Sequence, residues 1–402
     1  MNANIAAIYR IAKKPVRQII GLMSGTSMDG LDVALCEVSG AGVNTEVALK
    51  QFVTIEYTAD IKNEIRKVFA KKNIDFQHLT LLNEWVGILH AEMVLDCLQA
   101  WKISPQEIDL IASHGQTVMH VPRILHGQEK FPNATLQIGD GDHIAVKTGI
   151  ATISDFRQKH IAAGGEGAPL AAYGDYFIFG KQGENRIMLN MGGIANFTYL
   201  PGSMNPMDVF VTDTGPGNTL LDAITKLHFP EKEYDKDAEI SLKGSPNTAL
   251  GAALKNNVFF TKLFPKTTGP ELFSVEYVKQ AQAQSKTEKI SPFDLLATLT
   301  QFSAETIAEG IQFAITDNKL NIIDFTIYMS GGGMHNPLLV SMLQRLLPCR
   351  FCKTDELGIL GDAKEAVLFA ILANETVAGG FSDFGTRKGI PSVSMGKISF
   401  PT

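Results

Sequence analysis

Three segments of the chain share one pattern, in which a short apolar run ends in a glycine-rich loop. The loops are GLMSGTSMDG at 21–30, MGGIAN at 191–196 and GGGMHN at 331–336. A tight hairpin needs only two turn residues, so the longer first loop, whose central residues are nearly all Gly, Ser, Thr or Asp, indicates a segment built to hold a ligand. Because strand, glycine loop and strand recur in both halves of the chain, the sequence predicts two domains of related construction.

Helical periodicity separates these strand-like runs. Apolar residues at three-and-four spacing predict a long helix over 78–101 and another from 292 to about 315. Asn336 and Pro337 suit the N-cap and the first residue of a further helix. Strands that alternate with helices indicate an α/β fold, and a length of 402 residues suggests two domains.

The expected domain boundaries follow from this order of elements. The first residues are basic and carry no acid, and no small-residue cleavage site follows, so we expect a mobile N-terminal extension over 1–16 rather than a secretory signal. A first lobe over 17–160 follows, and the C-terminal segment 381–402 is expected to pack back on it. The second lobe then covers 161–380.

Charge and cysteine usage exclude several classes of protein. The net charge of −6 gives no support to a nucleic-acid or anionic-membrane partner, and no apolar run reaches the ~20 residues that span a bilayer. Four cysteines in a chain of this length favour a reduced, cytoplasmic compartment. Cys349 and Cys352 form a lone CxxC pair, for which small apolar core residues are the favoured interpretation over a metal or redox site.

The glycine loops do not match the common nucleotide-binding signatures. Leu31 stands where a P-loop would have its lysine, and no G-x-G-x-x-G follows a strand. What remains is a concave loop whose backbone N–H groups converge on an anion, with hydroxyl donors from Ser24, Thr26 and Ser27. Asp29 and Asp32 fit beside a polyphosphate only if Mg²⁺ or its water ligands intervene, because magnesium prefers oxygen ligands and keeps some water.

Eight ordered segments carry a resemblance to a known family. They are GLMSGTSMDGLDVALCEV, HGQTVMH, LQIGDGDHIAVKTGI, SDFRQKHIAAGGEGAPL, LNMGGIANFT, DTGPGNTLLDA, YDKDAE and SGGGMHNPLL. Together they resemble the anhydro-N-acetylmuramic acid kinases of the acetate/sugar kinase–actin-like ATPase superfamily, from about Arg17 almost to the end of the chain. Two departures stand out, since Glu166 replaces an expected glutamine and Met119 an expected aromatic residue.

This resemblance implies a fold and a reaction. The fold is α/β with two lobes, each a ribonuclease-H-like mixed sheet with helices on both faces, which close over a cleft for ATP and sugar. The implied activity opens 1,6-anhydro-N-acetylmuramic acid with water and phosphorylates the freed oxygen, giving N-acetylmuramic acid 6-phosphate in cell-wall recycling. ATP and Mg²⁺ are the implied cofactors, and a homodimer is expected.

The resemblance also implies roles for individual residues. Asp213, at the end of the apolar run VFVTD, is the implied general base for water, although Asp before Thr-Gly-Pro is also a common turn former. The residues implied to bind ATP are Gly25, Thr26, Ser27, Met28, Asp29, Gly30, Leu31, Asp32, Gly192, Gly193, Gly331, Gly332 and Gly333. Those expected to bind the sugar are His114, Gln116, Thr117, Asp155, Arg157 and Glu365.

Some alternatives stay open at this point. Arg157 suits the lactyl carboxylate of the substrate, yet a surface ion pair is an equal explanation. Glu365 fits either a capping box with Asp362 as N-cap or a sugar contact. An ordinary sugar or carboxylate kinase and a sugar-responsive binding module are the rival functions. The first would transfer phosphate without adding water, and the second would show a degraded site or a DNA-binding domain.

Overall fold

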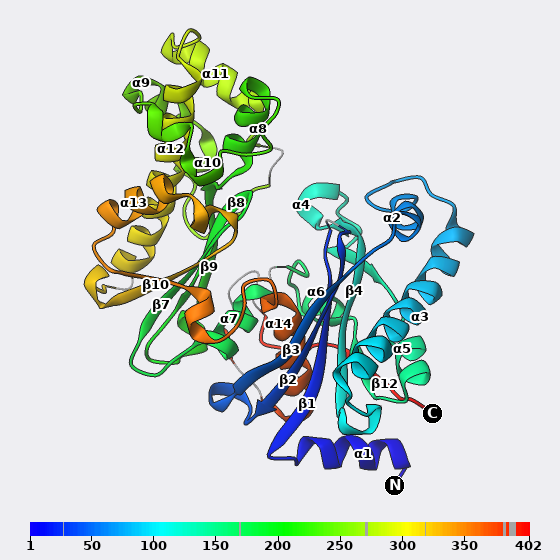
Figure 1. Cartoon of the computed structure of the whole chain (residues 1–402). Coiled ribbons are helices and arrows are strands. Elements are labelled where there is room, and N and C mark those ends of the chain that lie inside the picture. Colours follow the sequence, from blue (N-terminus) through cyan, green and yellow to red (C-terminus); the bar gives the residue numbers. More distant parts are fainter. Residues whose placement is uncertain (27, 169, 270–271, 318, 381–382, 386–390) are drawn as a thin grey trace. The chain divides into compact units, whose positions relative to one another are not determined.

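The computed structural model of the chain describes residues 1–402 apart from 27, 169, 270–271, 318, 381–382 and 386–390. The chain forms two compact units. Unit 1 comprises Met1–Gly180 and Gly358–Thr402, and unit 2 comprises Lys181–Leu357 (Figure 1). The predicted boundary at 160 is therefore wrong, since the first lobe continues to Gly180. The chain also returns to unit 1 at Gly358 rather than at 381.

A mixed sheet forms the centre of unit 1. Strands β1, β2 and β3 are antiparallel neighbours, β4 runs parallel to β1, β6 runs parallel to β4, and β12 closes the edge antiparallel to β6. Strand β5 pairs with the far end of β4. The strands are β1 (Val16–Ser24), β2 (Gly30–Ser39), β3 (Glu46–Glu56), β4 (Leu110–Val121), β5 (Ala134–Ile138), β6 (Thr152–Ser154) and β12 (Lys397–Ser399).

Unit 2 repeats this strand order. Its sheet reads β9-β8-β7-β10-β11, in which the first three strands are antiparallel and β10 and β11 are parallel to β7. Both units therefore have the 3-2-1-4-5 order of a ribonuclease-H-like sheet, which confirms the predicted α/β class and the related construction of the two domains. The strands are β7 (Asn185–Met191), β8 (Ile194–Leu200), β9 (Phe210–Pro216), β10 (Phe325–Ser330) and β11 (Arg350–Lys353).

Helices surround each sheet. In unit 1 they are α1 (Ala3–Ala12), α2 (Ala59–Arg66), α3 (Phe76–Trp101), α4 (Arg123–His126), α5 (Gly141–Thr148), α6 (Phe156–Ala162), α7 (Ala171–Phe179) and α14 (Lys364–Ala378). In unit 2 they are α8 (Thr219–His228), α9 (Thr248–Lys255), α10 (Val258–Thr261), α11 (Val275–Ser285), α12 (Pro292–Asp317) and α13 (Pro337–Leu346). None of the helices within the described ranges is both long and apolar enough to cross a membrane.

The periodicity predictions are confirmed in their main features. Helix α3 covers the predicted 78–101, and α12 begins at Pro292 as expected. Asn336 caps α13, because its side chain accepts the Leu339 N–H at 3.0 Å, and Pro337 is the first helical residue.

The N-terminal extension is not a loose segment in this structure. Residues Ala3–Ala12 form α1, which Asn2 caps and which contacts α14. Arg17 is buried and fixes the connection to β1, because its guanidinium donates to the carbonyls of Lys14 and Gly40, each at 2.6 Å. The predicted mobility of 1–16 is therefore wrong. Helix propensity and this buried arginine order the segment instead.

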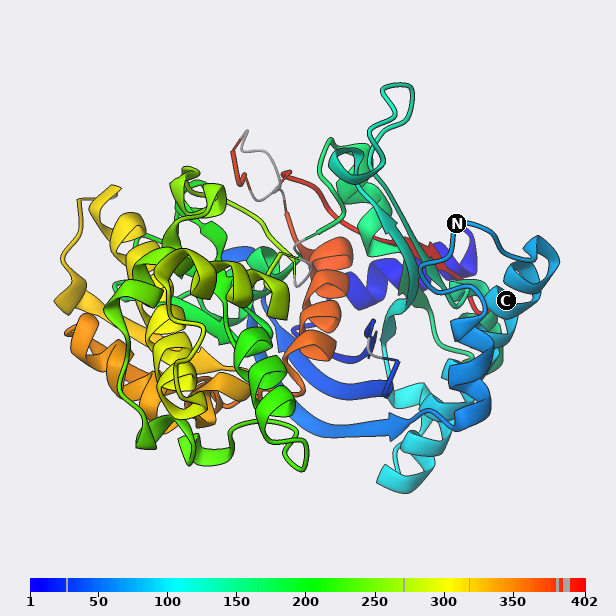
Figure 2. The same cartoon turned by 90° about the horizontal axis from the view of Figure 1, so that it is seen from above.

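Helix α14 covers one face of the unit 1 sheet, while α3 lies on the other (Figure 1, Figure 2). Side chains alternate along β1, so Ile20 and Leu22 enter the core cluster that includes α3. Gly21 lies between them and faces α14. A Cβ atom there would lie far inside contact distance of the Ala366 carbonyl oxygen. A residue without a side chain therefore permits the helix to pack directly on the strand.

We expect Gly21→Ala to lower the free energy of unfolding of unit 1 by about 1–3 kcal/mol, as overpacking typically does. The clash is with backbone, which cannot rotate away as a side chain could. Urea unfolding followed by circular dichroism measures the change. Gly251→Ala is the matched control, because a Cβ at this position within α9 meets nothing within 4 Å. The control should be stabilising by roughly 0.5–1 kcal/mol, and equal effects of the two variants would contradict the packing argument.

Candidate active site

The first glycine loop joins β1 to β2 in unit 1. Within it the Met28 N–H donates to the Gly25 carbonyl at 3.2 Å, and Met28 adopts a left-handed φ of 58°. Thr26 and Asp29 are exposed and Gly25 is partly exposed, so these three can reach a ligand. Ser27 lies outside the described residues.

Other predicted residues of this loop face the protein interior. Met28 and Leu31 belong to the core cluster, with 8% and 0% of their surface exposed. Gly30 is already paired with Glu56 in the sheet. The side chains of Met28 and Leu31 are therefore unavailable to ATP, because strand alternation turns Leu31 inward and Met28 packs into the same core cluster from the loop. Only their backbone atoms could serve the loop.

Negative charge gathers beside the loop. Asp32 accepts a hydrogen bond from the Thr54 hydroxyl at 2.6 Å. Burial raises the pKa of the Asp32 carboxyl above its ordinary value, and Asp362 and Asp29 raise it further, against the lowering effect of Thr54. Such mutual repulsion is what a nearby cation would relieve. Asp29, Asp32 and Asp362 do not form a close group of three ligand atoms in the described structure, so they would hold a magnesium ion only through its water ligands.

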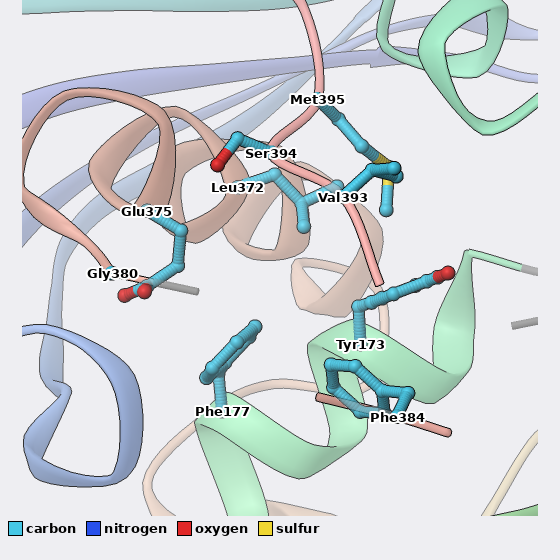
Figure 3. A pocket seen from close by; sticks show the side chains of 9 residues that line it. All are labelled: Tyr173, Phe177, Leu372, Glu375, Gly380, Phe384, Val393, Ser394 and Met395. Atoms are coloured by element: carbon cyan, nitrogen blue, oxygen red, sulfur yellow. The ribbon is translucent and has the colours of Figure 1, made fainter. Parts of the chain in front are cut away.

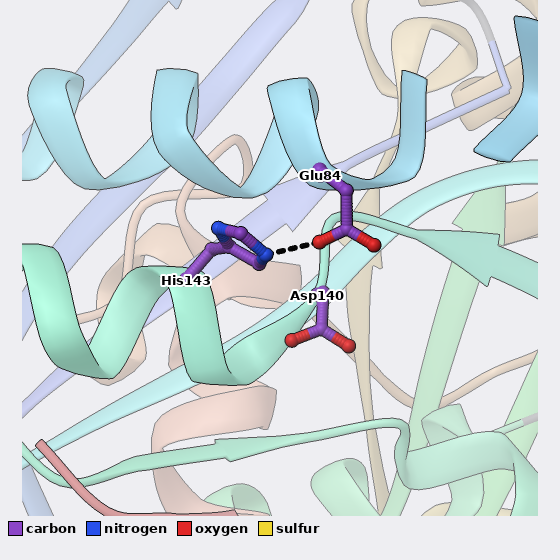
Figure 4. A group of neighbouring side chains, drawn as sticks. All are labelled: Glu84, Asp140 and His143. Carbon is purple, nitrogen blue, oxygen red and sulfur yellow. Dashed lines mark ion pairs between the residues drawn. The ribbon is translucent and has the colours of Figure 1, made fainter. Parts of the chain in front are cut away.

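A tighter group of candidate metal ligands lies elsewhere in unit 1. Glu84, Asp140 and His143 place one ligand atom each within 4.8 Å of one another (Figure 4). It is the one such group of three found among the residues that are described. His143 forms an ion pair with Glu84, and Asp140 caps α5 through the Asp142 N–H. These contacts give the side chains a structural role between α3 and α5. We therefore assign no metal to them.

The HGQT segment lies within β4, and most of its side chains are turned inward. Gln116 is fully buried, and its amide donates to the carbonyls of Gly25 and Thr117 and accepts from the Ser24 hydroxyl. Thr117 accepts from Gln137 at 3.1 Å. The prediction that Gln116 binds the sugar is therefore wrong for this structure, because the side chain is buried and bonded to Ser24, Gly25 and Thr117.

His114 supports an arginine rather than a ligand. Its Nδ1–H donates to the Gly115 carbonyl at 2.7 Å, and its Nε2 accepts from Arg157 Nε at 2.8 Å. Burial lowers the pKa of His114 to about 3, and the Arg157 charge contributes, so the ring is neutral and can accept this bond. The sugar contact predicted for His114 is thus not available, since the ring is buried and both of its nitrogens are used.

Arg157 is held at two points and partly exposed. Besides His114, its Nη1 donates to the Gly167 carbonyl at 2.6 Å. These contacts leave Nη2 outside both bonds. The guanidinium is therefore oriented by a buried histidine and a loop carbonyl, an arrangement typical of a preorganised anion site rather than of a mobile surface ion pair.

Glu365 and Asp155 have different surroundings. The predicted capping box is wrong, because α14 has Ala363 as its N-cap without a side-chain bond. Glu365 is exposed in the first turn, and the pKa of its carboxyl is raised by desolvation although the charge of Arg157 opposes this. Asp155 adopts a left-handed φ of 58° ahead of α6 and pairs with Lys397.

In unit 2, Asp213 lies on β9 opposite Asn196 of β8. One carboxylate oxygen, Oδ2, accepts the Thr268 N–H at 2.8 Å, and the residue is partly exposed. Burial raises the pKa of Asp213 to about 6, against the lowering effect of the Thr268 bond. A carboxylate fixed through one oxygen, partly accessible and with a pKa near neutrality has the properties of a general base.

The remaining glycine loops meet at the carboxyl ends of β7 and β10. The Asn218 N–H donates to the Gly192 carbonyl at 2.8 Å, and the Asn218 side chain donates to the Met191 carbonyl at 3.0 Å. A Cβ on Gly333 would meet Met191 and the Asn218 amide. Gly331 has a φ of 78°, which favours glycine. Unit 2 thus brings both predicted loops together around Asn218, which follows Asp213 by five residues in the sequence.

Comparison with known proteins identifies the family of this chain. The model of the family "Anhydro-N-acetylmuramic acid kinase" matches residues 17–394. The chain belongs to this family. A protein of that name from Pseudoalteromonas atlantica (strain T6c / ATCC BAA-1087) is 55% identical over 404 residues, which cover 100% of both chains. One from Caldanaerobacter subterraneus subsp. tengcongensis is 37% identical over 396 residues, 98% of this chain and 99% of that protein.

A more distant likeness exists among solved structures. Component A of (R)-2-hydroxyglutaryl-CoA dehydratase from Acidaminococcus fermentans aligns with a TM-score of 0.40 at 12% identity, over 90% of this chain and 99% of that one. The assignment to the kinase family rests on the sequence relatives and not on this likeness.

Sequence reasoning about this member of the kinase family missed several polar residues. Asn218 could have been predicted, because it ends the DTGPGN segment that also contains Asp213. Thr268, Tyr57 and His90 carried no signal, since each is a single polar residue in an unremarkable stretch. Their contacts become visible only in the fold, where Thr268 bonds to Asp213, Tyr57 bonds to the first glycine loop and His90 bonds to Tyr57.

Two further features of this family member concern packing rather than ligand binding. A cavity of about 30 Å³ between α7, α14 and residues 393–395 is lined by Tyr173, Phe177 and Phe384, among others (Figure 3), and has room for about one water molecule. Cys349 and Cys352 are free, and burial raises the pKa of the Cys349 thiol to about 11. Cys349 packs against the core cluster of unit 2, as the favoured interpretation of the CxxC pair had it, whereas the buried Cys352 thiol is hydrogen-bonded to Glu356 and Arg350.

Proposed function

We propose that the chain opens 1,6-anhydro-N-acetylmuramic acid with water and phosphorylates it from ATP, giving N-acetylmuramic acid 6-phosphate in cell-wall recycling. The family match over residues 17–394 carries this proposal. The partly buried carboxylate of Asp213, oriented by one backbone N–H, supplies the chemistry that the reaction requires of the protein.

Asp213 serves as the general base. Thr268 holds Oδ2, so Oδ1 remains to accept a proton from water. The water oxygen bonds to the anomeric carbon, the bond from that carbon to the bridging oxygen breaks, and the bridging oxygen takes the γ-phosphoryl group as ADP departs. A pKa of about 6 leaves Asp213 ionised at neutral pH while keeping it more basic than an exposed carboxylate.

The glycine loops hold the nucleotide. The accessible backbone of Gly25, Thr26 and Asp29 in unit 1 and of Gly192, Gly193, Gly331 and Gly332 in unit 2 suits phosphate groups, while Gly333 is buried and could serve only by letting its loop pack against Met191. Mg²⁺ is proposed beside Asp29 and Asp32; burial raises the pKa of the Asp32 carboxyl, and the nearby charges of Asp362 and Asp29 add to this. Bound there, the ion would neutralise charge on the transferred phosphoryl group.

The sugar is recognised through its carboxylate. Arg157, oriented by His114 and the Gly167 carbonyl, has Nη2 outside those bonds and carries the charge that a lactyl group requires. Glu365 and Thr117 are the further candidates for sugar hydroxyls. We also expect a homodimer in the cytoplasm without nucleic-acid or membrane partners, and the four free cysteines fit a reducing compartment.

Oxygen-18 water tests the proposal. With ATP, Mg²⁺ and 1,6-anhydro-N-acetylmuramic acid, we expect a product heavier by both phosphate and water, with the label at the anomeric hydroxyl, by mass spectrometry. Omission of Mg²⁺ should abolish turnover. A product that gains phosphate but no labelled oxygen would instead identify an ordinary sugar kinase.

A further inference from the structure

A buried chain of hydrogen bonds lies beneath the first glycine loop. His90 Nε2 is 2.7 Å from the Tyr57 hydroxyl, which is 2.9 Å from the Ser24 hydroxyl, and that hydroxyl is 2.6 Å from Gln116 Oε1. Gln116 Nε2 then donates to the Gly25 carbonyl at 3.0 Å. The chain therefore runs from α3 through the residue after β3 to the loop itself, and its members other than Gly25 are at most 3% exposed.

The partners fix the direction of every bond. Gln116 Nε2 lies against two carbonyls, those of Gly25 and Thr117, so the amide cannot be reversed and Oε1 must face Ser24. Ser24 has one hydroxyl hydrogen, and Oε1 can only accept, so Ser24 donates to it. Ser24 Oγ must then accept from the Tyr57 hydroxyl, which leaves Tyr57 to accept from His90.

His90 is consequently required as the neutral tautomer with hydrogen on Nε2. Its Nδ1 is buried and has no hydrogen-bond partner in the described part of the chain, which suits a bare lone pair better than an N–H. Burial also lowers the pKa of His90 to about 4, so the ring carries no charge at neutral pH.

The same residues turn the carbonyls of the loop inward. The Gly25 carbonyl accepts from Gln116 and the Asp29 carbonyl accepts the Tyr57 N–H at 2.9 Å. Tyr57 thus contacts both ends of the loop, one by its side chain and one by its backbone. Carbonyl oxygens directed inward cannot oppose an anion on the outer side of the loop.

We propose that Tyr57 and His90 are positioning residues that hold residues 24–26 and 28–30 of the first glycine loop in a phosphate-binding conformation through this directional chain. The proposal rests on the proposed function, in that it takes the loop to bind nucleotide phosphates. Neither residue touches the ligand; both act through Ser24 and Gln116.

Tyr57→Phe tests the proposal, because it keeps the buried ring and removes only the hydroxyl. Ser24 Oγ and the His90 Nε2–H then lose their partner. We expect the Kd of a non-hydrolysable ATP analogue, measured by calorimetry, to rise roughly tenfold, while the KM for the sugar changes less than about twofold. His90→Gln, whose amide can donate from a place near Nε2, should retain nucleotide binding better than His90→Leu.

Tyr277→Phe is the matched control. Its hydroxyl donates to the Leu254 carbonyl within unit 2 and makes no contact with the chain of bonds in unit 1, so its removal should cost comparable stability and leave nucleotide affinity unchanged. If Tyr57→Phe loses stability as the control does yet binds the analogue as the wild type does, Tyr57 is merely structural and the proposal fails.

A second measurement needs no variant at all. Long-range ¹H–¹⁵N NMR of the wild-type chain should show His90 with hydrogen on Nε2 at neutral pH. An Nδ1–H tautomer or an imidazolium would overturn the chain of donors. Neither this spectrum nor the binding of the analogue depends on turnover of the sugar. A wild-type chain that binds nucleotide but leaves the anhydro sugar unchanged would therefore contradict the proposed function and not the positioning role.

Discussion

Replacing Asp213 by asparagine is expected to lower kcat by roughly 10²- to 10⁴-fold, the range over which a general base contributes, with little change in ATP or sugar binding. The substitution keeps the shape of the side chain, and the amide oxygen can still accept the Thr268 N–H. It removes only the ability to take a proton from water. Steady-state kinetics with both substrates measures the loss, and turnover close to the wild-type value would exclude Asp213 as the base.

Stability separates catalytic from structural importance at this position. The folded-state pKa of Asp213 is raised from 3.8 to about 6, so the fold favours the protonated carboxyl and ionisation costs stability as pH rises through that window. Asp213→Asn should therefore unfold at a higher temperature than the wild type at pH 7, and the difference should disappear near pH 4. A variant destabilised at pH 7 would indicate a structural carboxylate.

The same pKa predicts the acid limb of the rate profile. Because the base must be ionised, kcat/KM should fall as pH drops below about 6, with unit slope in a logarithmic plot. Initial rates between pH 4.5 and 8 would reveal it. An apparent pKa near the ordinary value for aspartate would show that the carboxylate is better solvated during catalysis than the structure indicates.

Arg157→Ala should raise the KM for the anhydro sugar by roughly 100-fold, since truncating one partner of a charged hydrogen-bonded pair costs 2–5 kcal/mol. The KM for ATP should stay nearly constant. Arg157→Lys should recover only part of the loss, because an ammonium group cannot reproduce the fork that His114 and the Gly167 carbonyl orient.

A second substrate tests the contact between Arg157 and the lactyl carboxylate directly. The anhydro sugar that lacks the lactyl group should be a poor substrate for the wild type, and Arg157→Ala should hardly affect its KM. Arg345→Ala controls for loss of a positive charge, since Arg345 is exposed and donates to the Ser341 carbonyl of its own helix. If Arg157→Ala raises the KM by the same factor for both sugars, Arg157 has a role other than binding the carboxylate.

Residues that follow a period or a motif could be predicted from the sequence. The long helices α3 and α12, the Asn336–Pro337 start of α13 and the repeated strand–loop–strand units were all readable because each depends on neighbours close in the chain. The sequence predicted Asp213 at the end of a strand, whereas the structure places it within β9, at a partly exposed position.

The sequence could not predict which side chains are free to bind a ligand, because this depends on partners that are distant in sequence. His114 and Gln116 look like ligand donors in HGQT, yet Arg157 donates to His114, and Gln116 is bonded to the Ser24 hydroxyl and the Gly25 carbonyl. Glu365 matched a capping pattern, but α14 begins one residue too late for Asp362 to cap it. The return of the chain to unit 1 at Gly358 depends on the packing of α14 against β1, which no local pattern announces.

The discontinuous course of unit 1 has a consequence for biosynthesis. Translation delivers residues 1–180 first, but α14, which must cover the Gly21 side of β1, is encoded after the whole of unit 2. Unit 2, which is contiguous in sequence, can therefore fold while residues 1–180 still expose an apolar face of their sheet. A nascent chain arrested at residue 357 should accordingly carry a protease-resistant central portion and a chaperone-dependent N-terminal one.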